Sequence, residues 1–356
     1  MTRPDVPEIS WFGALCDDDY EFLGVPDPEL VSSWPHCRDI TLTAERLGYD
    51  NILLPSGYAL GIDSVAFASA VAPLTERMRL LVAVRCGELV VPQLARQLAT
   101  IDHLLGGRLT INIISSDLPG ETLDSGPRYQ RTREHMAALR SFLEGEPVVT
   151  RGDFVDLELD PPRIATVHGG CPPFYFGGFS PDAKRTAAEQ ADVFLTWPDT
   201  VASVASTVDE MAALAAAEGR ELRYGLRTHV IVRETEGTAM DAARRLVSQL
   251  DADTGEAIRH RSLDARSAGV ARQSELRDGA DDDGFAEANL WTGIGRARSG
   301  AGAAIVGDPD QVRAKLDAYR DVGIDAFILS GYPHLAECEH FARLVLDDLP
   351  HAPLTI

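Results

Sequence analysis

Residues 80–114, LLVAVRCGELVVPQLARQLATIDHLLGGRLTINII, contain one complete strand–helix–strand unit. Leu80–Val84 is a continuous apolar run, which is typical of a strand covered on both faces. A helical segment over 92–105 follows; a proline opens it, where proline is favoured, and Gly106-Gly107 ends it. Leu109–Ile114 is the next strand. This order predicts two parallel neighbours in one sheet, joined by a helix.

The same alternation runs through the rest of the chain. Eight segments have the apolar character of buried strands: Ile9–Leu15, Asn51–Leu54, Leu80–Val84, Leu109–Ile114, Pro173–Phe176, Val193–Leu195, Tyr224–Val232 and Ala326–Leu329. Each is followed by at least one helical segment. Eight such units favour a closed (β/α)8 TIM barrel over an open sheet. We therefore expect one domain over residues 1–356, with no linker that would divide it.

One region interrupts the alternation. Residues 251–302, after the seventh strand and its helix, are polar and rich in Asp, Arg and Gly. Long insertions in a compact domain are usually functional or disordered. From its position, the insertion could reach over the mouth of the barrel. We interpret it as a mobile lid.

Composition and charge exclude several classes of function. Hydrophobic residues make up 45% of the 356 residues, enough for a large core, and the net charge of −22 disfavours binding to nucleic acid or an anionic membrane. No apolar run approaches a membrane span or a signal peptide, which predicts a cytoplasmic protein. The five cysteines are odd in number and show no CxxC spacing, so neither a disulfide framework nor a zinc site is expected.

The segment Gly177-Gly178-Phe179-Ser180-Pro181 is the clearest local signal at a strand end, where active sites of such barrels lie. Two glycines allow a ligand to approach the backbone closely. Ser180 can cap the next helix, whose free N–H groups and dipole suit a phosphate. An ordinary tight turn with a good cap explains the same residues, and Asp182 mildly favours that alternative because it already supplies negative charge.

Several polar or aromatic side chains are expected near the same end of the barrel. Arg227 and His229 alternate on one strand, so both point to one face, where they meet each other, water or a ligand. Arg298 ends the proposed lid and by itself suggests a solvated surface residue. Tyr332 follows the last strand, and Trp197 follows the sixth. A structural polar cluster and simple aromatic packing are the alternatives for these residues.

Other chemistries fit poorly. The chain has no GxSxG, Walker A or HExxH motif, and Gly293-x-Gly295 follows no strand and lacks a third glycine, so it is not a dinucleotide fingerprint. The histidines are dispersed without the spacing of metal ligands. We therefore expect no metal site.

Long strings of the sequence resemble those of one family, the alkanesulfonate monooxygenase group of the bacterial luciferase-like flavin enzymes. The resemblance covers most of the chain and is most specific in 229–235 (HVIVRET) and 329–335 (LSGYPHL). The other matching strings are 44–50 (AERLGYD), 95–97 (ARQ), 128–129 (RY), 175–178 (YFGG) and 298–302 (RSGAG).

The resemblance implies FMN, supplied as FMNH2 by a separate NAD(P)H-dependent reductase, and O2 as co-substrate. It implies cleavage of the C–S bond of an organosulfonate, which yields sulfite and an aldehyde, in a homodimer or homotetramer. By motif, the residues at the sulfonate would be Arg227, His229, Arg298, Tyr332 and Trp197. The residues at FMN would be Asn112, Ser115, Tyr129, Gly177, Gly178 and Ser180.

Two loops depart from the alkanesulfonate pattern. Leu60 stands where many of these enzymes have cysteine, and the segment 55–63 around it differs from theirs. Asp17–Glu21 is dense in hydrogen-bonding groups, which suit hydroxyl recognition, whereas an alkyl tail needs an apolar slot. Both loops are more similar to the branch that acts on sulfoquinovose, the sulfonated glucose of plant lipids, and would give 6-dehydroglucose.

Four alternatives remain open from the sequence. A simple alkanesulfonate monooxygenase differs only in its substrate. A deazaflavin-dependent dehydrogenase of the same fold would transfer hydride without consuming oxygen. A flavin-sequestering protein of the luciferase type would bind flavin and release no sulfite, and it would need no pair of arginines beside a histidine. A purely structural barrel does not account for the motif strings.

Overall fold

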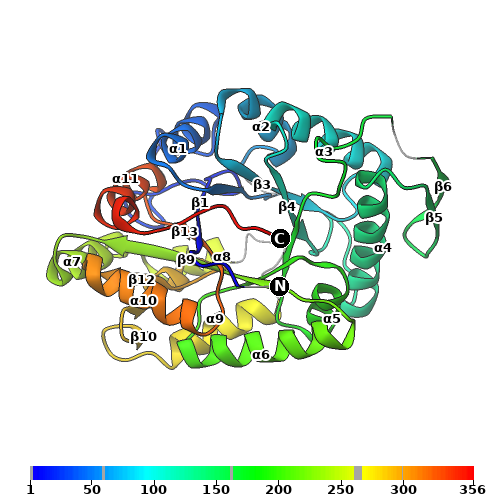
Figure 1. Ribbon diagram of the computed structural model, residues 1–356. Helices are drawn as coiled ribbons and strands as arrows, with labels where there is room; N and C mark the ends of the chain where they lie inside the picture. The colour runs from blue at the N-terminus through cyan, green and yellow to red at the C-terminus, as the bar shows by residue number, and fades with distance from the viewer. Residues whose placement is uncertain (1–2, 58–60, 161–162, 260–266, 299) are drawn as a thin grey trace.

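The computed structural model describes the chain except residues 1–2, 58–60, 161–162, 260–266 and 299. Its centre is a closed barrel of eight parallel strands, which confirms the predicted fold (Figure 1). The strands are β1 (Glu8–Phe12), β2 (Asn51–Leu54), β3 (Arg79–Arg85), β4 (Leu109–Ile114), β7 (Phe174–Gly177), β8 (Val193–Thr196), β9 (Arg223–Val232) and β13 (Ala326–Ser330). They pair in this order, and β13 closes the ring on β1.

Helices cover the outside of this barrel (Figure 1). They are α1 (Trp34–Leu47), α2 (Ser64–Val71), α3 (Val91–Leu105), α4 (Ser125–Leu143), α5 (Pro181–Gln190), α6 (Val201–Ala217), α10 (Pro309–Asp321) and α11 (His334–Leu344). Strand residues alternate between two cores: Leu80 and Val82 belong to the core shared with the helices, whereas Leu81 and Ala83 belong to a smaller cluster with Phe12 inside the barrel. The alternation follows from the two-residue period of a strand.

The amino-terminal end of the barrel is filled by a buried carboxylate. Glu8 accepts hydrogen bonds from Ser10 Oγ (3.1 Å), Asn51 Nδ2 (3.4 Å), Tyr175 Oη (3.2 Å) and the Leu354 backbone N–H (2.9 Å). Leu354 comes from the carboxyl-terminal segment, which crosses this end of the barrel near its centre in Figure 1. Every donor is provided by the protein itself, so this end is a closed structural plug.

Strand β9 is twice as long as its neighbours and changes partner along one edge. Its first half pairs with β8 up to Leu226, and its second half pairs with β12 (Ala304–Gly307) from His229 onward. β13 stays on the other edge throughout. Arg227 and Thr228 therefore lie where β8 and β12 diverge, at the carboxyl end of the barrel. This divergence makes room for side chains at the barrel mouth.

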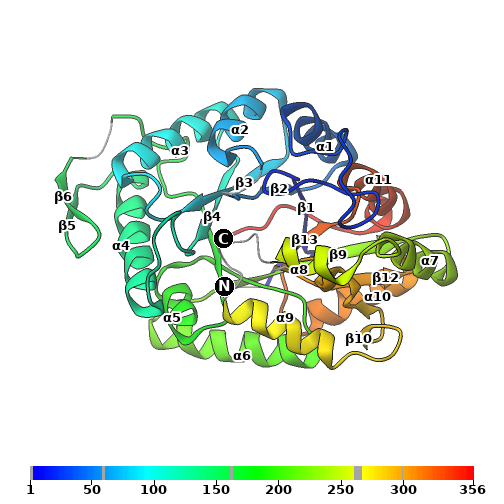
Figure 2. The ribbon, with the colours of Figure 1, turned by 180° about the vertical axis from the view of Figure 1, so that it is seen from behind.

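The insertion after β9 is folded where it is described. After α7 (Glu236–Leu246), it contains α8 (Ala252–Arg259), α9 (Ala268–Asp278), β10 (Phe285–Glu287), β11 (Leu290–Trp291) and η2 (Gly293–Arg296). Figure 2 shows α9 beside α6 and α8 close to β9 and β13. Arg272 of α9 donates to both oxygens of Asp199 (2.6 and 3.0 Å), and Gln273 donates to the Pro198 carbonyl (2.8 Å). These bonds attach α9 to the loop after β8; a lid motion of 251–302 stays a prediction.

Three features were not expected from the sequence. A hairpin of β5 (Val148–Arg151) and β6 (Asp156–Leu159) projects beside α4, and the insertion contains short strands and two helices. The hairpin strands are mostly exposed and lack an apolar face, which removes the signal by which strands are recognised.

Among the described residues, no helix is long and apolar enough to cross a membrane, and no cluster of metal-binding side chains is found.

Candidate active site at the carboxyl end of the barrel

Arg227 is buried at the carboxyl end of the barrel, with 6% of its surface exposed. Its Nη1 donates to the Thr228 carbonyl (2.8 Å), and its guanidinium lies over the Phe12 ring, 4.1 Å from the centroid. Burial, together with the nearby Arg298, lowers the pKa of Arg227 to about 9. Within the described part of the chain, no carboxylate forms an ion pair with this guanidinium.

His229 is fully buried beside Arg227 on β9. Its Nδ1 lies 2.8 Å from Ser330 Oγ, and its ring stacks on Tyr332 with centroids 5.3 Å apart. Burial, and then the positive charges of Arg227 and Arg298, hold the pKa of His229 well below its ordinary value, so the ring is neutral. Its Nε2 has no hydrogen-bond partner among the described residues. Buried polar atoms are rarely left so in proteins, which points to a ligand.

Arg298 follows η2 and reaches the same cluster from the insertion. Its Nη1 is 3.2 Å from Asp17 Oδ2. Burial disfavours its charge, but Tyr332, Cys16 and Asp17 more than compensate and raise the pKa of Arg298 above its ordinary value. Since Asp17 neutralises only one of the two guanidinium groups, the cluster carries one excess positive charge. An otherwise strongly acidic protein thus presents a local site for an anion.

Tyr332 joins these residues from the end of β13. It is 6% exposed, and burial raises the pKa of its phenol, which stays protonated. Trp197 lies apart, at the end of β8, where it packs against Phe179 with centroids 6.2 Å apart. A Cβ on Gly269 of α9 would lie 2.7 Å from the Trp197 ring. The structure therefore brings four of the five expected residues together and places Trp197 under the insertion.

The residues expected at FMN lie on β4, α4, β7 and α5. A Cβ on Gly177 would lie 2.0 Å from the Leu195 carbonyl oxygen. A Cβ on Gly178 would lie 2.6 Å from the Ala183 side chain and 3.5 Å from the Tyr129 hydroxyl. Side chains are thus excluded at both glycines, and the phenol of Tyr129 lies beside exposed backbone.

The turn after β7 ends in a capped helix. Ser180 Oγ accepts a hydrogen bond from the Ala183 N–H (3.2 Å), and Asp182 accepts one from Ser125 Oγ (2.6 Å). Pro181 has no N–H, and the Lys184 N–H donates to the Ser180 carbonyl (3.0 Å), so the Asp182 N–H is the donor of the first turn of α5 left for a ligand. The Asp182 carboxylate is occupied by Ser125. The turn therefore offers a flavin phosphate one backbone N–H and the positive end of the helix dipole.

Asn112 and Ser115 occupy the neighbouring strand end. Asn112 is half-buried and pairs in register with Ala83, which faces the barrel interior. Ser115 Oγ accepts a hydrogen bond from Thr132 Oγ1 of α4 (2.6 Å). β4 and β7 are adjacent, whereas the arginine cluster is formed by β9, the end of β13 and the insertion, with Asp17 from the loop after β1. The two groups of residues thus face each other across the barrel mouth.

Comparison with known proteins assigns the chain to a family. The family model described as luciferase-like monooxygenase matches residues 23–326. The chain belongs to this family. A sulfoquinovose monooxygenase of Novosphingobium aromaticivorans is 61% identical over 98% of both chains, and one of Agrobacterium fabrum is 49% identical over 98% of this chain and 92% of its own. An EDTA monooxygenase of Chelativorans shares the fold, with a TM-score of 0.77, 18% identity and coverage of 97% and 93%.

The protein is therefore a monooxygenase of the luciferase-like family, and the resemblance to this family that the sequence motifs indicated is confirmed.

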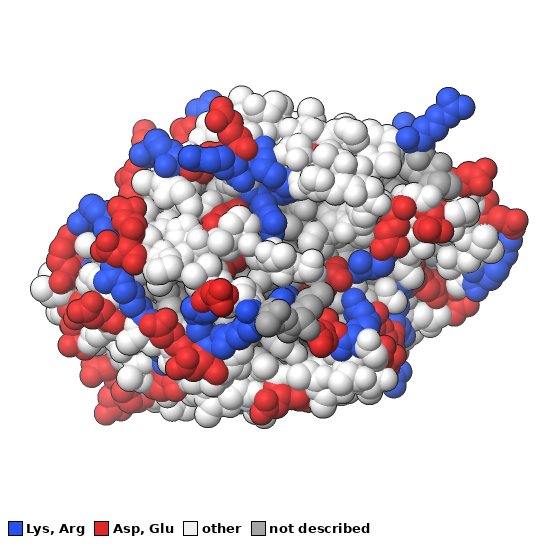
Figure 3. Space-filling model, viewed as in Figure 1, with Lys and Arg blue, Asp and Glu red and all other residues white. Residues whose placement is uncertain are grey.

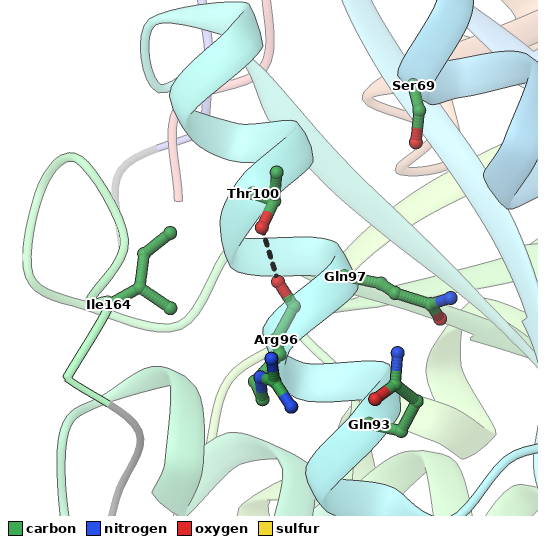
Figure 4. Close-up of a pocket in the computed structure, with 6 residues that line it drawn as sticks. All are labelled: Ser69, Gln93, Arg96, Gln97, Thr100 and Ile164. Atoms are coloured by element: carbon green, nitrogen blue, oxygen red, sulfur yellow. Dashed lines mark hydrogen bonds between the residues drawn. The ribbon is translucent and has the colours of Figure 1, made fainter.

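A separate cavity of about 360 Å³ lies on the outer surface of the enzyme (Figure 4), lined by Ser69, Gln93, Arg96, Gln97, Thr100 and Ile164. This cavity lies on the helical layer, on α2 and α3, and contains none of the residues described above. Figure 3 shows acidic and basic side chains interspersed over one face.

Sequence reasoning missed the partners of the cluster. Ser330, Phe12 and His334 contact its members, and Asp19 lies behind them, fully buried. Asp19 was expected to contribute to hydroxyl recognition, but its carboxylate is occupied by protein donors. The only signal in the sequence was the two-residue period of side-chain direction along a strand, which places the side chains of Phe12 and Ser330 inside the barrel. The Asp19–His334 pair joins positions 315 apart, which no local pattern reveals.

Proposed function

We propose that this enzyme cleaves the C–S bond of sulfoquinovose with FMNH2 and O2, releasing sulfite and 6-dehydroglucose. The observation that carries the proposal is the near full-length identity of 61% with a sulfoquinovose monooxygenase. The site is consistent with it, because a sulfonate is a permanent anion and the cluster has an excess positive charge. Planar guanidinium groups bind such oxygens in pairs.

The proposed roles follow from the contacts. Arg227 and Arg298 hold the sulfonate, and Asp17 orients Arg298 through its 3.2 Å contact. Tyr332, a buried phenol, donates a hydrogen bond to the same group or to the oxygen at the reacting carbon. His229 is neutral, so its Nε2 can accept or donate one hydrogen bond according to its tautomer. Trp197 and α9 keep water away from the reacting atoms.

FMN, supplied reduced by a separate reductase, would provide the electrons that activate O2. The residues that would hold it are Asn112, Ser115, Tyr129, Gly177, Gly178 and Ser180. In this assignment, the helix N-terminus at Ser180 binds the phosphate, and the glycine backbone approaches it without a side chain. The flavin would then lie across the barrel mouth from Arg227.

The choice between a sugar and an alkyl sulfonate depends on the loops after β1 and β2. In the first loop, Asp17 contacts Arg298, Asp18 accepts from the Ser32 N–H, and Glu21 pairs with Arg245 on the surface. A sugar hydroxyl would thus meet Asp17 together with Arg298. Residues 58–60 of the second loop, including Leu60, lie outside the described residues. A simple alkanesulfonate remains the second candidate substrate.

A sulfite-release assay coupled to an FMN reductase tests the proposal. Sulfoquinovose and octanesulfonate are compared at equal concentration with the purified enzyme, and oxygen consumption is followed in parallel. The proposal requires faster release of sulfite from sulfoquinovose, with one O2 consumed per sulfite. Faster turnover of octanesulfonate would establish the alkanesulfonate alternative. Absence of sulfite from every sulfonate, with flavin bound, would establish a flavin-sequestering protein.

A further inference from the structure

A second polar unit lies behind Tyr332 and is not part of the anion-binding cluster. Asp19 is fully buried, and its carboxylate accepts from His36 Nε2 (3.0 Å), His334 Nδ1 (2.9 Å), the His334 N–H (2.8 Å) and the Tyr20 N–H (2.9 Å). The electrostatic effect of His334, its two hydrogen bonds and the hydrogen bond from His36 hold the pKa of Asp19 well below its ordinary value despite burial. The carboxylate is therefore ionised and saturated, and it has no free lone pair for a substrate.

The carboxylate determines the form of the His334 ring. Since Asp19 is an acceptor only, His334 Nδ1 carries a proton and donates a hydrogen bond to the carboxylate. His334 is 3% exposed, and its Nε2 has no hydrogen-bond partner among the described residues. His229 and His334 are thus two buried imidazoles with an unpartnered Nε2, and Tyr332 contacts both.

Tyr332 lies between these two rings. His334 meets it edge-on, with centroids 5.0 Å apart and planes at 87°, whereas His229 stacks on it at 23°. The opposite contact of His334 is Phe12, stacked at 5.8 Å, and Arg227 lies over that same phenyl ring. The position of the His334 ring therefore constrains Tyr332 directly and the Arg227 environment through Phe12.

The unit extends from the cluster toward the protein surface. His36 is in the first turn of α1, and its side chain is 9% exposed. Asp19 is in the loop after β1, and His334 is the first residue of α11. Three elements thus contribute one titratable group each. The other titratable or charged groups around them are Asp17, Cys37, Arg227, His229, Arg298 and Tyr332.

We propose that Asp19 and His334 are positioning residues of the active site: Asp19 fixes His334 as its Nδ1–H tautomer, and the His334 ring holds Tyr332 against His229. The proposal rests on the proposed function. Buried carboxylates that fix an imidazole tautomer in this way can change turnover greatly while the fold is kept. His36 completes the unit at its outer end.

The consequence for catalysis is that kcat depends on this unit more than KM does. In Asp19→Asn the carboxylate that accepts from both His334 Nδ1 and the His334 backbone N–H is lost, so the ring is no longer held in place. The tautomer is also no longer fixed, which lowers kcat at neutral pH by about tenfold or more. The KM for the sulfonate changes little, because Arg227 and Arg298 are intact.

The matched control is a second buried aspartate–histidine pair at the other end of the barrel. Asp50 Oδ2 lies 2.9 Å from His351 Nδ1 and also accepts from the Ile9 N–H (2.8 Å). Asp50→Asn removes the same kind of ion pair with no contact to Tyr332. It is expected to lower stability and to leave the kcat of the folded enzyme close to the native value.

The experiment combines kinetics with histidine NMR on the full chain. ¹⁵N-histidine spectra, which need neither flavin nor turnover, should show the Nδ1–H tautomer at His334 in the native protein and its loss in Asp19→Asn. The kcat of sulfite release should fall in Asp19→Asn and stay close to the native value in Asp50→Asn, with the KM for the sulfonate little changed in both. An Nε2–H tautomer in the native protein, or an unchanged kcat in Asp19→Asn, would overturn the proposal. If no sulfonate were turned over, the NMR result would still decide it, so the two failures are distinguishable.

Discussion

The two ends of the barrel contain buried polar clusters of opposite character. At the amino-terminal end, Glu8 is surrounded by four donors that the protein supplies. At the carboxyl end, Arg227 has no anionic partner and His229 leaves Nε2 without a hydrogen bond, among the described residues. A complete polar network stabilises a fold, whereas an incomplete one is tolerated only where a ligand completes it. We therefore infer that the cluster at the amino-terminal end stabilises the fold and that the cluster at the carboxyl end binds a ligand.

The largest expected effect is at the carboxyl end. Replacing Arg298 with Ala removes a charge-assisted contact to the sulfonate and leaves Asp17 unpaired. We expect kcat/KM for sulfite release to fall by about 10³-fold, which corresponds to about 4 kcal/mol. Arg46→Ala is the control, since Arg46 pairs with Glu339 on the surface. Wild-type kcat/KM in Arg298→Ala would remove this arginine from the proposed site.

The corresponding change at the amino-terminal end should act on stability alone. Glu8→Ala leaves the donors of Asn51, Tyr175 and Leu354 unpaired inside the barrel. We expect the free energy of unfolding in urea to fall by about 3–5 kcal/mol. The kcat/KM of the folded fraction should stay within about twofold of the native value. A selective loss of activity without loss of stability would refute the division between the two ends.

A smaller effect is expected at the glycine turn. Gly177→Ala would place a Cβ 2.0 Å from the Leu195 carbonyl oxygen and push β7 away from β8. Overpacking of this kind costs about 1–3 kcal/mol, and FMN affinity measured by fluorescence titration should weaken about tenfold. Gly126→Ala is the control, because a Cβ there meets nothing within 4 Å. Unchanged FMN affinity in Gly177→Ala would place the flavin elsewhere.

The smallest effect concerns the pH dependence of stability, and its sign differs between the two ends. Burial raises the pKa of Glu8 above 4.5, so its contribution is present below pH 4.5 and is lost as the pH rises through the raised value. Despite burial, the electrostatic effect of His334 and hydrogen bonds from His334 and His36 lower the pKa of Asp19 below 3.8, so its contribution is present above pH 3.8 and is lost on further acidification. We therefore expect the free energy of unfolding, measured in urea at a series of pH values, to depend less on pH above pH 4.5 in Glu8→Gln than in the native protein. In Asp19→Asn it should depend less on pH below pH 3.8. Equal slopes in both variants would contradict the two signs.

The barrel could be predicted from the sequence because each of its strands is short, apolar and followed by a helix. Leu80–Val84 and Leu109–Ile114, for example, are both barrel strands in the structure. The site was partly accessible for the same reason, since Arg227 and His229 share a face by strand periodicity alone. That strand periodicity also places Glu8 inside the barrel, but it gives no reason why its hydrogen bonds are complete.

The remaining features depend on contacts between distant parts of the chain. Asp17 meets Arg298 across 281 positions, and Asp19 meets His334 across 315. The position of Trp197 depends on how α9 packs over it, and the division of β9 between β8 and β12 depends on the insertion. None of these contacts leaves a periodic or local signal, so only the folded structure shows them.

The most direct test of the account is a crystal structure of the enzyme with oxidised FMN and sulfoquinovose. The account predicts the sulfonate oxygens within hydrogen-bond distance of both Arg227 and Arg298, at the carboxyl end of the barrel, with Tyr332 beside them. Sulfoquinovose bound in another cavity, or at this end with its sulfonate turned away from both arginines, would contradict it.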